Sequence, residues 1–78
     1  MPTLLRSGPY RVYITSHDRG EPPHVHVDRE KFSAKFWLGP VRLSYNLGYP
    51  ARELRAIEKM LSDRETELEE DWNAYFST

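Results

Sequence analysis

The sequence predicts a two-layer α+β domain: an antiparallel meander of three to four strands, followed by two C-terminal helices packed on one sheet face. Three observations predict it. Apolar and polar residues alternate between residues 10 and 46, which is the period of a strand. After Gly48 apolar residues recur every three or four positions, as in an amphipathic helix. The links between the alternating stretches are short, which favours antiparallel pairing. A chain of 78 residues has room for one domain, which we expect over residues 1–78.

Four alternating stretches are the predicted strands, over about residues 10–15, 23–28, 31–38 and 41–46. Turn-forming or charged residues separate them, and Pro40 breaks the last link because it has no amide to donate to a ladder. In each strand one alternating set is apolar and should face the core. The members of this set are Tyr10, Val12, Ile14, Val25, Val27, Phe32, Ala34, Phe36, Leu38, Val41, Leu43 and Tyr45.

Two helices are predicted over about residues 50–61 and 63–76. Pro50 suits the first turn of the earlier helix, where a missing amide costs nothing. Ser62 followed by Glu65 matches a capping box, so Ser62 is the predicted N-cap of the later helix. The apolar stripes of the two helices are Leu54, Ile57, Met60 and Leu61, then Leu68, Trp72, Tyr75 and Phe76.

The net charge of -1 conceals an uneven distribution. Residues 1–60 carry ten Lys/Arg against six Asp/Glu, whereas residues 61–78 carry one against six. The acidic segment is interpreted as the solvated face of a helix. Its Asp and Glu residues are favourable near the N-terminus, where the helix dipole is positive. Such a charge distribution indicates which kinds of partner the protein attracts, and it does not bear on the fold.

The composition excludes several classes of protein. The absence of cysteine excludes a disulfide scaffold, a thiolate metal site and a cysteine nucleophile. There is no P-loop, no dinucleotide fingerprint and no Gly-x-Ser-x-Gly motif. No apolar run approaches the roughly 18 residues of a membrane helix, and the first residues do not resemble a signal peptide. We therefore expect a soluble, cytoplasmic protein that requires no cofactor and makes no membrane contact.

If both helices cover one sheet face, nothing in the chain remains to cover the other. We call this second face the open face. The sequence predicts that it is polar and basic and carries two aromatic residues and two histidines. Its predicted binding residues are Arg11, Tyr13, His24, His26, Lys35, Trp37 and Arg42.

His24 and His26 are two positions apart, so on a strand both side chains point to the same side. Four interpretations are open: cross-strand packing against Trp37 or its neighbours, contact with RNA bases, acid/base catalysis of RNA cleavage, and metal ligation. Two imidazoles alone do not complete a metal site. Further ligands would come from the preceding loop, which offers His17, Asp18 and Glu21.

The aromatic and basic residues of the open face have three interpretations. Bases can stack on Tyr13 and Trp37 while phosphates meet the neighbouring cations, as in single-stranded RNA binding. Trp, Tyr and Arg are also the usual anchors of protein interfaces, including homodimers. The same aromatics can simply be good strand formers.

Residues 22–27 read Pro-Pro-His-Val-His-Val, and residues 34–38 read Ala-Lys-Phe-Trp-Leu. On these two strings the chain resembles a family of small bacterial proteins, domain of unknown function 4160. Further matching stretches are residues 1–6, 41–48 and 53–58, with Trp72, Tyr75 and Phe76. Pro50 departs from the Ser or similar cap expected there, which affects only the start of the helix. The family has no established catalytic residues, so the resemblance implies none here.

The resemblance implies a component of a two-gene module that lies beside a second small protein, and such pairs are suspected toxin–antitoxin systems. The sequence therefore predicts a toxin–antitoxin-like component whose open face binds a small partner protein encoded nearby, or RNA. The alternatives are a non-enzymatic homodimeric or heterodimeric adaptor and a histidine-based metal-binding domain. If the protein is an enzyme, it cleaves RNA, with His24 or His26 as the acid or base.

Overall fold

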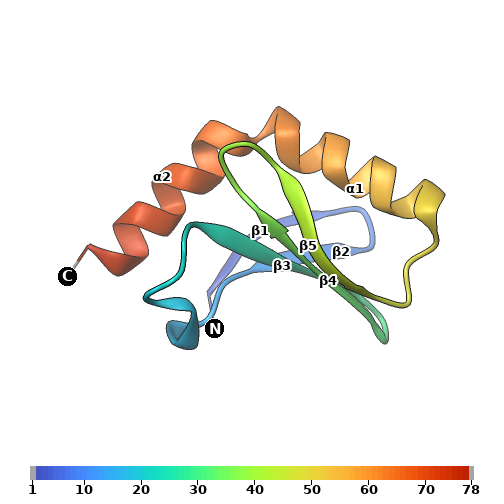
Figure 1. Ribbon diagram of the computed structural model, residues 1–78, viewed down its shortest axis with the longest axis horizontal. Helices are drawn as coiled ribbons and strands as arrows, with labels where there is room; N and C mark the ends of the chain where they lie inside the picture. The colour runs from blue at the N-terminus through green and yellow to red at the C-terminus, as the bar shows by residue number, and fades with distance from the viewer. Residues whose placement is uncertain (1, 78) are drawn as a thin grey trace.

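The computed structural model describes residues 2–77 and shows a sheet beneath two helices (Figure 1). Five strands precede the helices, and a short 3-10 turn, η1, lies between the second and third strands. The elements are β1 (Thr3–Ser7), β2 (Tyr10–Tyr13), η1 (Ser16–Asp18), β3 (His24–Arg29), β4 (Phe32–Trp37), β5 (Arg42–Leu47), α1 (Ala51–Asp63) and α2 (Glu65–Phe76).

The sheet is an antiparallel meander in the order β1-β2-β3-β4-β5, so the prediction of three to four strands was one strand short. The missed strand is β1, whose adjacent Leu4 and Leu5 break the alternation that reveals a strand. A register shift between Thr3 and Leu5 lets both leucines pack against the core. Local periodicity could not reveal a strand with a bulge in it.

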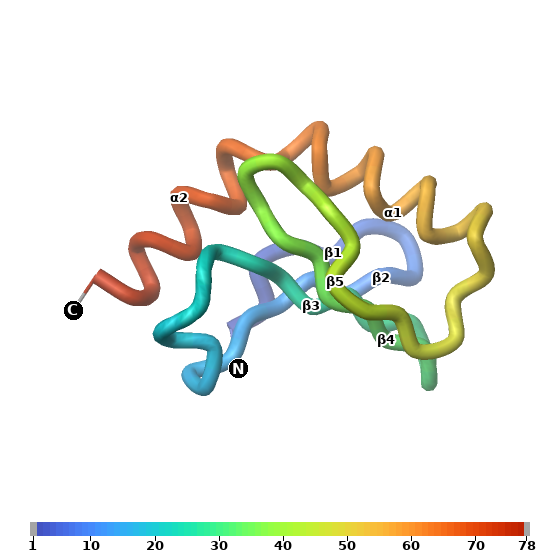
Figure 2. Tube along the Cα trace, viewed as in Figure 1, coloured from blue at the N-terminus to red at the C-terminus, as the bar shows by residue number. Residues whose placement is uncertain are grey.

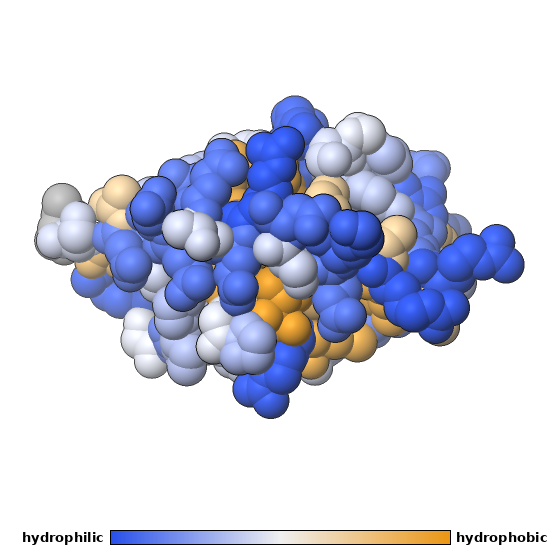
Figure 3. All heavy atoms as spheres, turned by 90° about the horizontal axis from the view of Figure 1, so that it is seen from above, coloured by the Kyte–Doolittle hydropathy of each residue, from blue (hydrophilic) through white to orange (hydrophobic). Residues whose placement is uncertain are grey.

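The core lies between the sheet and the helices, which arch over the same side of the sheet (Figures 1 and 2). Strand side chains at alternate positions meet one stripe from each helix, as the α+β prediction requires. The buried apolar residues are Val12, Ile14, Val25, Val27, Ala34, Phe36, Leu38, Tyr49, Ile57, Leu61, Leu68 and Trp72. The outer side of the helices is mostly hydrophilic, with some hydrophobic atoms visible between the charged side chains (Figure 3).

The prediction that Leu43 and Tyr45 lie in the core was wrong. They are 42% and 43% exposed. Lys35 pairs with Tyr45 but the next residue, Phe36, pairs with Leu43, so Ser44 is an extra residue in β5. This bulge moves Tyr45 to the face opposite Leu43, because one added residue reverses the alternation. Leu43 remains on the core face of the sheet, but it lies on the edge strand and its side chain is about half exposed.

The predicted helix junction was also wrong, because α1 continues through Ser62 to Asp63. Arg64, not Ser62, stands between the helices, and its amide bonds to the Leu61 carbonyl at 3.1 Å. Leu61 is fully buried, and a helix that continues two residues beyond it keeps this residue within a regular hydrogen-bonded segment. Pro50 is the N-cap of α1, one position before the first turn, and its carbonyl accepts the amides of Glu53 and Leu54 at 3.0 Å each.

A charged cluster ties the first turn of α1 to β3. Arg29 donates to both carboxylate oxygens of Glu53, and the Tyr10 hydroxyl donates to the same carboxylate at 2.8 Å. The hydrogen bond from Arg29 is the main cause that lowers the pKa of Glu53; burial opposes it, and Tyr10 assists it. A bidentate pair of this kind orients the helix on the sheet.

We predict that Glu53→Gln weakens the pH dependence of stability on the acid side. The pKa of Glu53 is lower in the folded than in the unfolded chain, so the contribution of the carboxylate is present above the unfolded value of about 4.3 and is lost as pH falls through the folded value. Urea denaturation at a series of pH values from 7 to 3 measures this loss of stability. Glu58→Gln, an exposed change on the same helix, is the control. Parallel curves for the wild type and Glu53→Gln would contradict the prediction.

No helix within residues 2–77 has the length and apolar character needed to cross a membrane.

Candidate functional site

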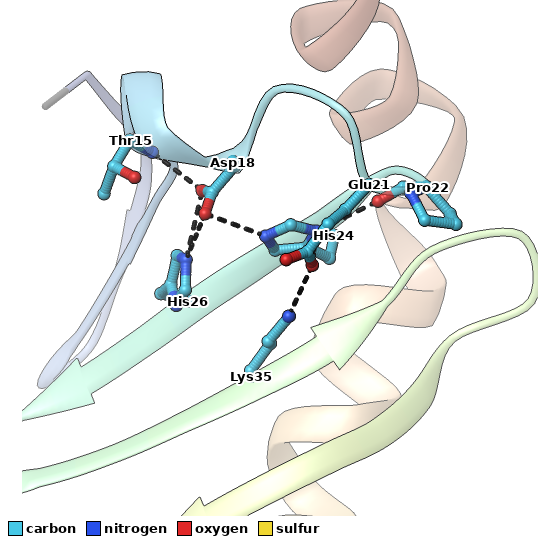
Figure 4. Close-up of polar contacts among 7 residues, drawn as sticks. All are labelled: Thr15, Asp18, Glu21, Pro22, His24, His26 and Lys35. Atoms are coloured by element: carbon cyan, nitrogen blue, oxygen red, sulfur yellow. Dashed lines mark hydrogen bonds and ion pairs between the residues drawn. The ribbon is translucent and has the colours of Figure 1, made fainter.

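The turn before β3 positions a single carboxylate. The Thr15 amide donates to Asp18 Oδ2 at 2.9 Å, and the Asp18 amide donates to the Thr15 carbonyl at 3.1 Å. These bonds close η1 and hold Asp18 with only 7% of its surface exposed. The carboxylate is therefore placed by backbone hydrogen bonds and points toward the start of β3 (Figure 4).

Two imidazoles on β3 meet this carboxylate, His24 at Oδ1 and His26 at both oxygens (Figure 4). His24 Nε2 lies 3.1 Å from Asp18 Oδ1, and His26 Nε2 lies 3.1 Å from Asp18 Oδ2. The two rings are edge to face, with centroids 5.3 Å apart. Among the described residues, these three side chains form a group in which one ligand atom from each lies within 4.8 Å of the others. We call them the Asp-His-His cluster.

The prediction that His24 lies on an exposed face was wrong, because its side chain is fully buried. By register His24 pairs with Trp37, as expected for the open face. However, the Trp37 and Trp72 rings pack on it, with centroids 5.5 and 5.0 Å away, and Asp18 approaches from η1. Because α2 and the η1 turn both reach the start of β3, His24 is covered. A fully buried imidazole is poorly placed to contact an RNA chain.

Burial opposes the ionisation of Asp18, but its hydrogen bond from Thr15 and its contacts with both histidines outweigh burial and lower the pKa of the carboxyl. The carboxylate is therefore ionised at neutral pH. A buried negative charge of this kind needs a cation or hydrogen-bond donors beside it.

The basic residues of the open face are largely engaged within the protein. Lys35 Nζ lies 2.7 Å from Glu21 Oε1 and 4.6 Å from the Trp37 ring centroid. The Arg11 guanidinium lies 4.5 Å over the Tyr13 ring, and its Nε donates to Thr3 Oγ1 at 2.8 Å. Tyr13 in turn stacks on His26, with centroids 5.2 Å apart. Arg42, at the start of β5, is exposed.

The sheet ends at an edge that exposes large apolar side chains. Within residues 2–77, β5 pairs with β4 on one side and with no strand on the other. Leu47 is 60% exposed, and Leu43 and Tyr45 add apolar surface on the two sides of the strand. We call these three residues the β5 edge; it borders the open face at Tyr45 and Leu47.

The structure brings together only some of the predicted site residues. Asp18 joins His24 and His26, whereas Glu21 pairs with Lys35 and exposed His17 is outside the cluster of described residues. The spacing of Thr15 and Asp18 fits a capping box, which was a usable signal for the placement of this carboxylate. No local signal indicated the contact of Trp72 with His24, because the two residues are 48 positions apart.

A shallow hollow of about 580 Å³ lies over the start of α1, lined by Pro50, Arg52, Glu53 and Ala56. Of its two charged residues, Arg52 and Glu53, the second is already paired with Arg29, at the end of β3 farthest from His24. The hollow therefore adds nothing to the Asp-His-His cluster.

The comparisons with known proteins give one match. A family model described as "Domain of unknown function (DUF4160)" matches residues 10–73, which include β2 through most of α2. No curated protein and no solved structure matches the chain. The match includes the whole Asp-His-His cluster and the β5 edge.

Proposed function

Because this chain belongs to the DUF4160 family, a domain of unknown function, we propose its role from its surface: it is a non-enzymatic protein-binding component of a small two-gene, toxin–antitoxin-like module. Its partner is the small protein encoded nearby, which adds a strand to the sheet at the β5 edge.

One observation carries the proposal. β5 is an edge strand that presents Leu43, Tyr45 and Leu47 at 42%, 43% and 60% exposure. An exposed, apolar edge strand is normally blunted in a monomer by inward charges, prolines, bulges or a covering element, because it readily pairs with another chain; of these devices β5 has the bulge at Ser44. Arg42 is the only charged residue in β5. Strand addition would supply main-chain hydrogen bonds, and side-chain contacts would supply specificity.

The open face is poorly suited to binding RNA. RNA binding requires free cations and accessible rings. Here Lys35 is paired with Glu21 and lies over Trp37, and Arg11 lies over Tyr13. The aromatics and cations that would hold bases and phosphates are therefore already partly occupied by one another.

A homodimer is the second candidate, and the charge pattern of β5 favours it. Two copies of β5 can pair antiparallel about the Ser44–Tyr45 bond, which places Arg42 opposite Leu47 of the other copy. No like charges then face one another, so β5 can pair with itself without repulsion.

The test is co-expression of this chain with the product of its neighbouring gene, followed by size-exclusion chromatography with light scattering. We expect a stoichiometric complex that Leu47→Lys weakens at least about tenfold, because a charge would be buried in the contact. Leu47 is mostly exposed, so the free variant should keep the melting temperature of the wild type.

Tyr75→Lys is the matched control, since it places the same charge on an exposed apolar residue of α2, away from β5. Complex formation that resists Leu47→Lys as well as Tyr75→Lys would contradict the proposed edge. A dimer of the isolated chain that Leu47→Lys dissociates would favour the homodimer. Binding of single-stranded RNA that is lost in Trp37→Ala but kept in Leu47→Lys would favour the RNA alternative.

A further inference from the structure

His24 places an unpartnered nitrogen in the interior of the protein. Its side chain is fully buried. Among the described residues, Nε2 of His24 has no hydrogen-bond partner of acceptable geometry, although Asp18 Oδ1 lies 3.1 Å away. Buried polar atoms are satisfied in the great majority of cases, so this exception needs an explanation.

The other nitrogen of the same ring indicates where the proton lies. His24 Nδ1 is 3.0 Å from the Pro22 carbonyl oxygen, which can only accept a hydrogen bond. Nδ1 is therefore the donor in this bond. Nε2, on the other side of the ring, is left 3.1 Å from a buried carboxylate oxygen of Asp18 without a hydrogen bond between them.

We propose that Asp18, His24 and His26 form a binding site for one divalent transition-metal ion, with Asp18 Oδ1 or Oδ2 and the Nε2 atoms of both histidines as ligands. A cation between these atoms would give the buried Nε2 of His24 the partner that it lacks. The bond from His24 Nδ1 to the Pro22 carbonyl is the arrangement found around metal-binding histidines, in which the outer N–H is held by a carbonyl or carboxylate.

The distances suit such an ion. Ligand atoms that share a cation at about 2.1 Å are roughly 3–4 Å apart. The Nε2 atoms of His24 and His26 each lie 3.1 Å from one Asp18 oxygen, and the three candidate ligand atoms lie within 4.8 Å of one another. A movement of less than about 1 Å by either ring closes the site.

The ligand types identify the class of metal. Two imidazoles and one carboxylate, with no thiolate, suit Zn²⁺, Co²⁺, Ni²⁺ or Fe²⁺ rather than Mg²⁺ or Ca²⁺, which prefer oxygen ligands. Three protein ligands leave a coordination position for water or for a further ligand. The side chains of Asp18 and His26 are 10% and 14% exposed, so the site opens to solvent on their side.

The protein contains its own reporters for this site. Its two tryptophans, Trp37 and Trp72, both pack against His24, with ring centroids 5.5 and 5.0 Å away. Co²⁺ bound between His24 and Asp18 would therefore quench tryptophan fluorescence at short range.

The test uses the full chain without a histidine tag, stripped with chelator and then titrated with Co²⁺ and Zn²⁺, with Mg²⁺ as the comparison. We expect one equivalent of Co²⁺ to quench the tryptophan fluorescence. Zn²⁺ should then displace the bound Co²⁺ and restore the fluorescence, whereas Mg²⁺ should not change it. At a hundredfold excess over Kd, Zn²⁺ should raise Tm by about 11–22 °C.

Asp18→Asn and His26→Gln keep the approximate size of the side chain and are expected to weaken binding at least about tenfold. His17→Ala is the matched control, since His17 is exposed and adjacent to Asp18 in η1. On the wild type, ¹⁵N NMR should show Zn²⁺ shifting the Nε2 resonances of His24 and His26 while the His24 Nδ1 proton remains. This measurement does not depend on the folding of any variant.

Several results would overturn the proposal. One is a folded wild-type chain whose fluorescence, Tm and imidazole resonances do not respond to stoichiometric Zn²⁺ or Co²⁺. Another is binding that His17→Ala weakens as much as Asp18→Asn does. The third is a His24 imidazole that carries protons on both nitrogens while Zn²⁺ is present, because a proton would then satisfy Asp18 instead of a metal.

Discussion

Trp72→Ala is expected to lower the free energy of unfolding by about 3–5 kcal/mol, the usual cost of removing a large aromatic side chain from a core. Trp72 is 6% exposed, and its ring packs against Phe76 at 4.4 Å and His24 at 5.0 Å between centroids. The change leaves a cavity at the point where α2 meets the start of β3.

This loss is a large fraction of the total. A domain of this length has a stability of about 4–12 kcal/mol, at roughly 0.05–0.15 kcal/mol per residue. Thermal and urea denaturation followed by circular dichroism would measure it, and we expect Tm to fall by at least about 12 °C. Tyr75→Ala, on the same helix but 39% exposed, should cost less than about 1 kcal/mol. Equal losses in the two variants would contradict the packing described for Trp72.

The second large effect is expected at Gly48→Ala, at about 2–5 kcal/mol. Gly48 has a φ of +108°, which side-chain-bearing residues rarely adopt. A Cβ there would lie 2.5 Å from Phe32 Cδ1. The backbone is not free to relax, because the Asn46 side chain holds both the amide and the carbonyl of Tyr49, at 3.0 and 2.9 Å.

Gly20→Ala separates the two causes. Gly20 has a similar φ of +98°, but a Cβ would meet no heavy atom within 4 Å. Gly20→Ala should therefore lower the free energy of unfolding only through backbone strain, by about 1–2 kcal/mol. The additional loss at Gly48 measures the clash with Phe32. If urea denaturation gave equal losses for both alanine variants, the close approach of Phe32 to Gly48 would be contradicted.

The two proposed sites depend on different parts of this fold. The β5 edge exists because a bulge at Ser44 and the end of the meander leave apolar residues uncovered. The Asp-His-His cluster exists because η1 and α2 converge on the start of β3. Leu47→Lys and Asp18→Asn can therefore test partner binding and metal binding separately.

Much of the fold could be predicted from the sequence because it depends on local pattern. Alternation in residues 23–28 and 31–38 identified β3 and β4, and the helical stripe with Ile57 and Leu61 identified α1. Membership of the DUF4160 family was also predicted, from the strings at residues 22–27 and 34–38. Short-range periodicity is sufficient for these inferences, since it reports which side chains share one face of one element.

The sequence by itself thus determined the α+β class, the order of β2 through α2, and the pairing of His24 with His26 on one side of a strand. Only the tertiary structure decided that Tyr45 leaves the core, that Leu47 ends on an exposed edge, and that His24 is buried beside Asp18. The physical reason is distance along the chain. A strand's own pattern fixes neither its register against its neighbour nor whether Trp72, 48 residues away, will cover one of its ends.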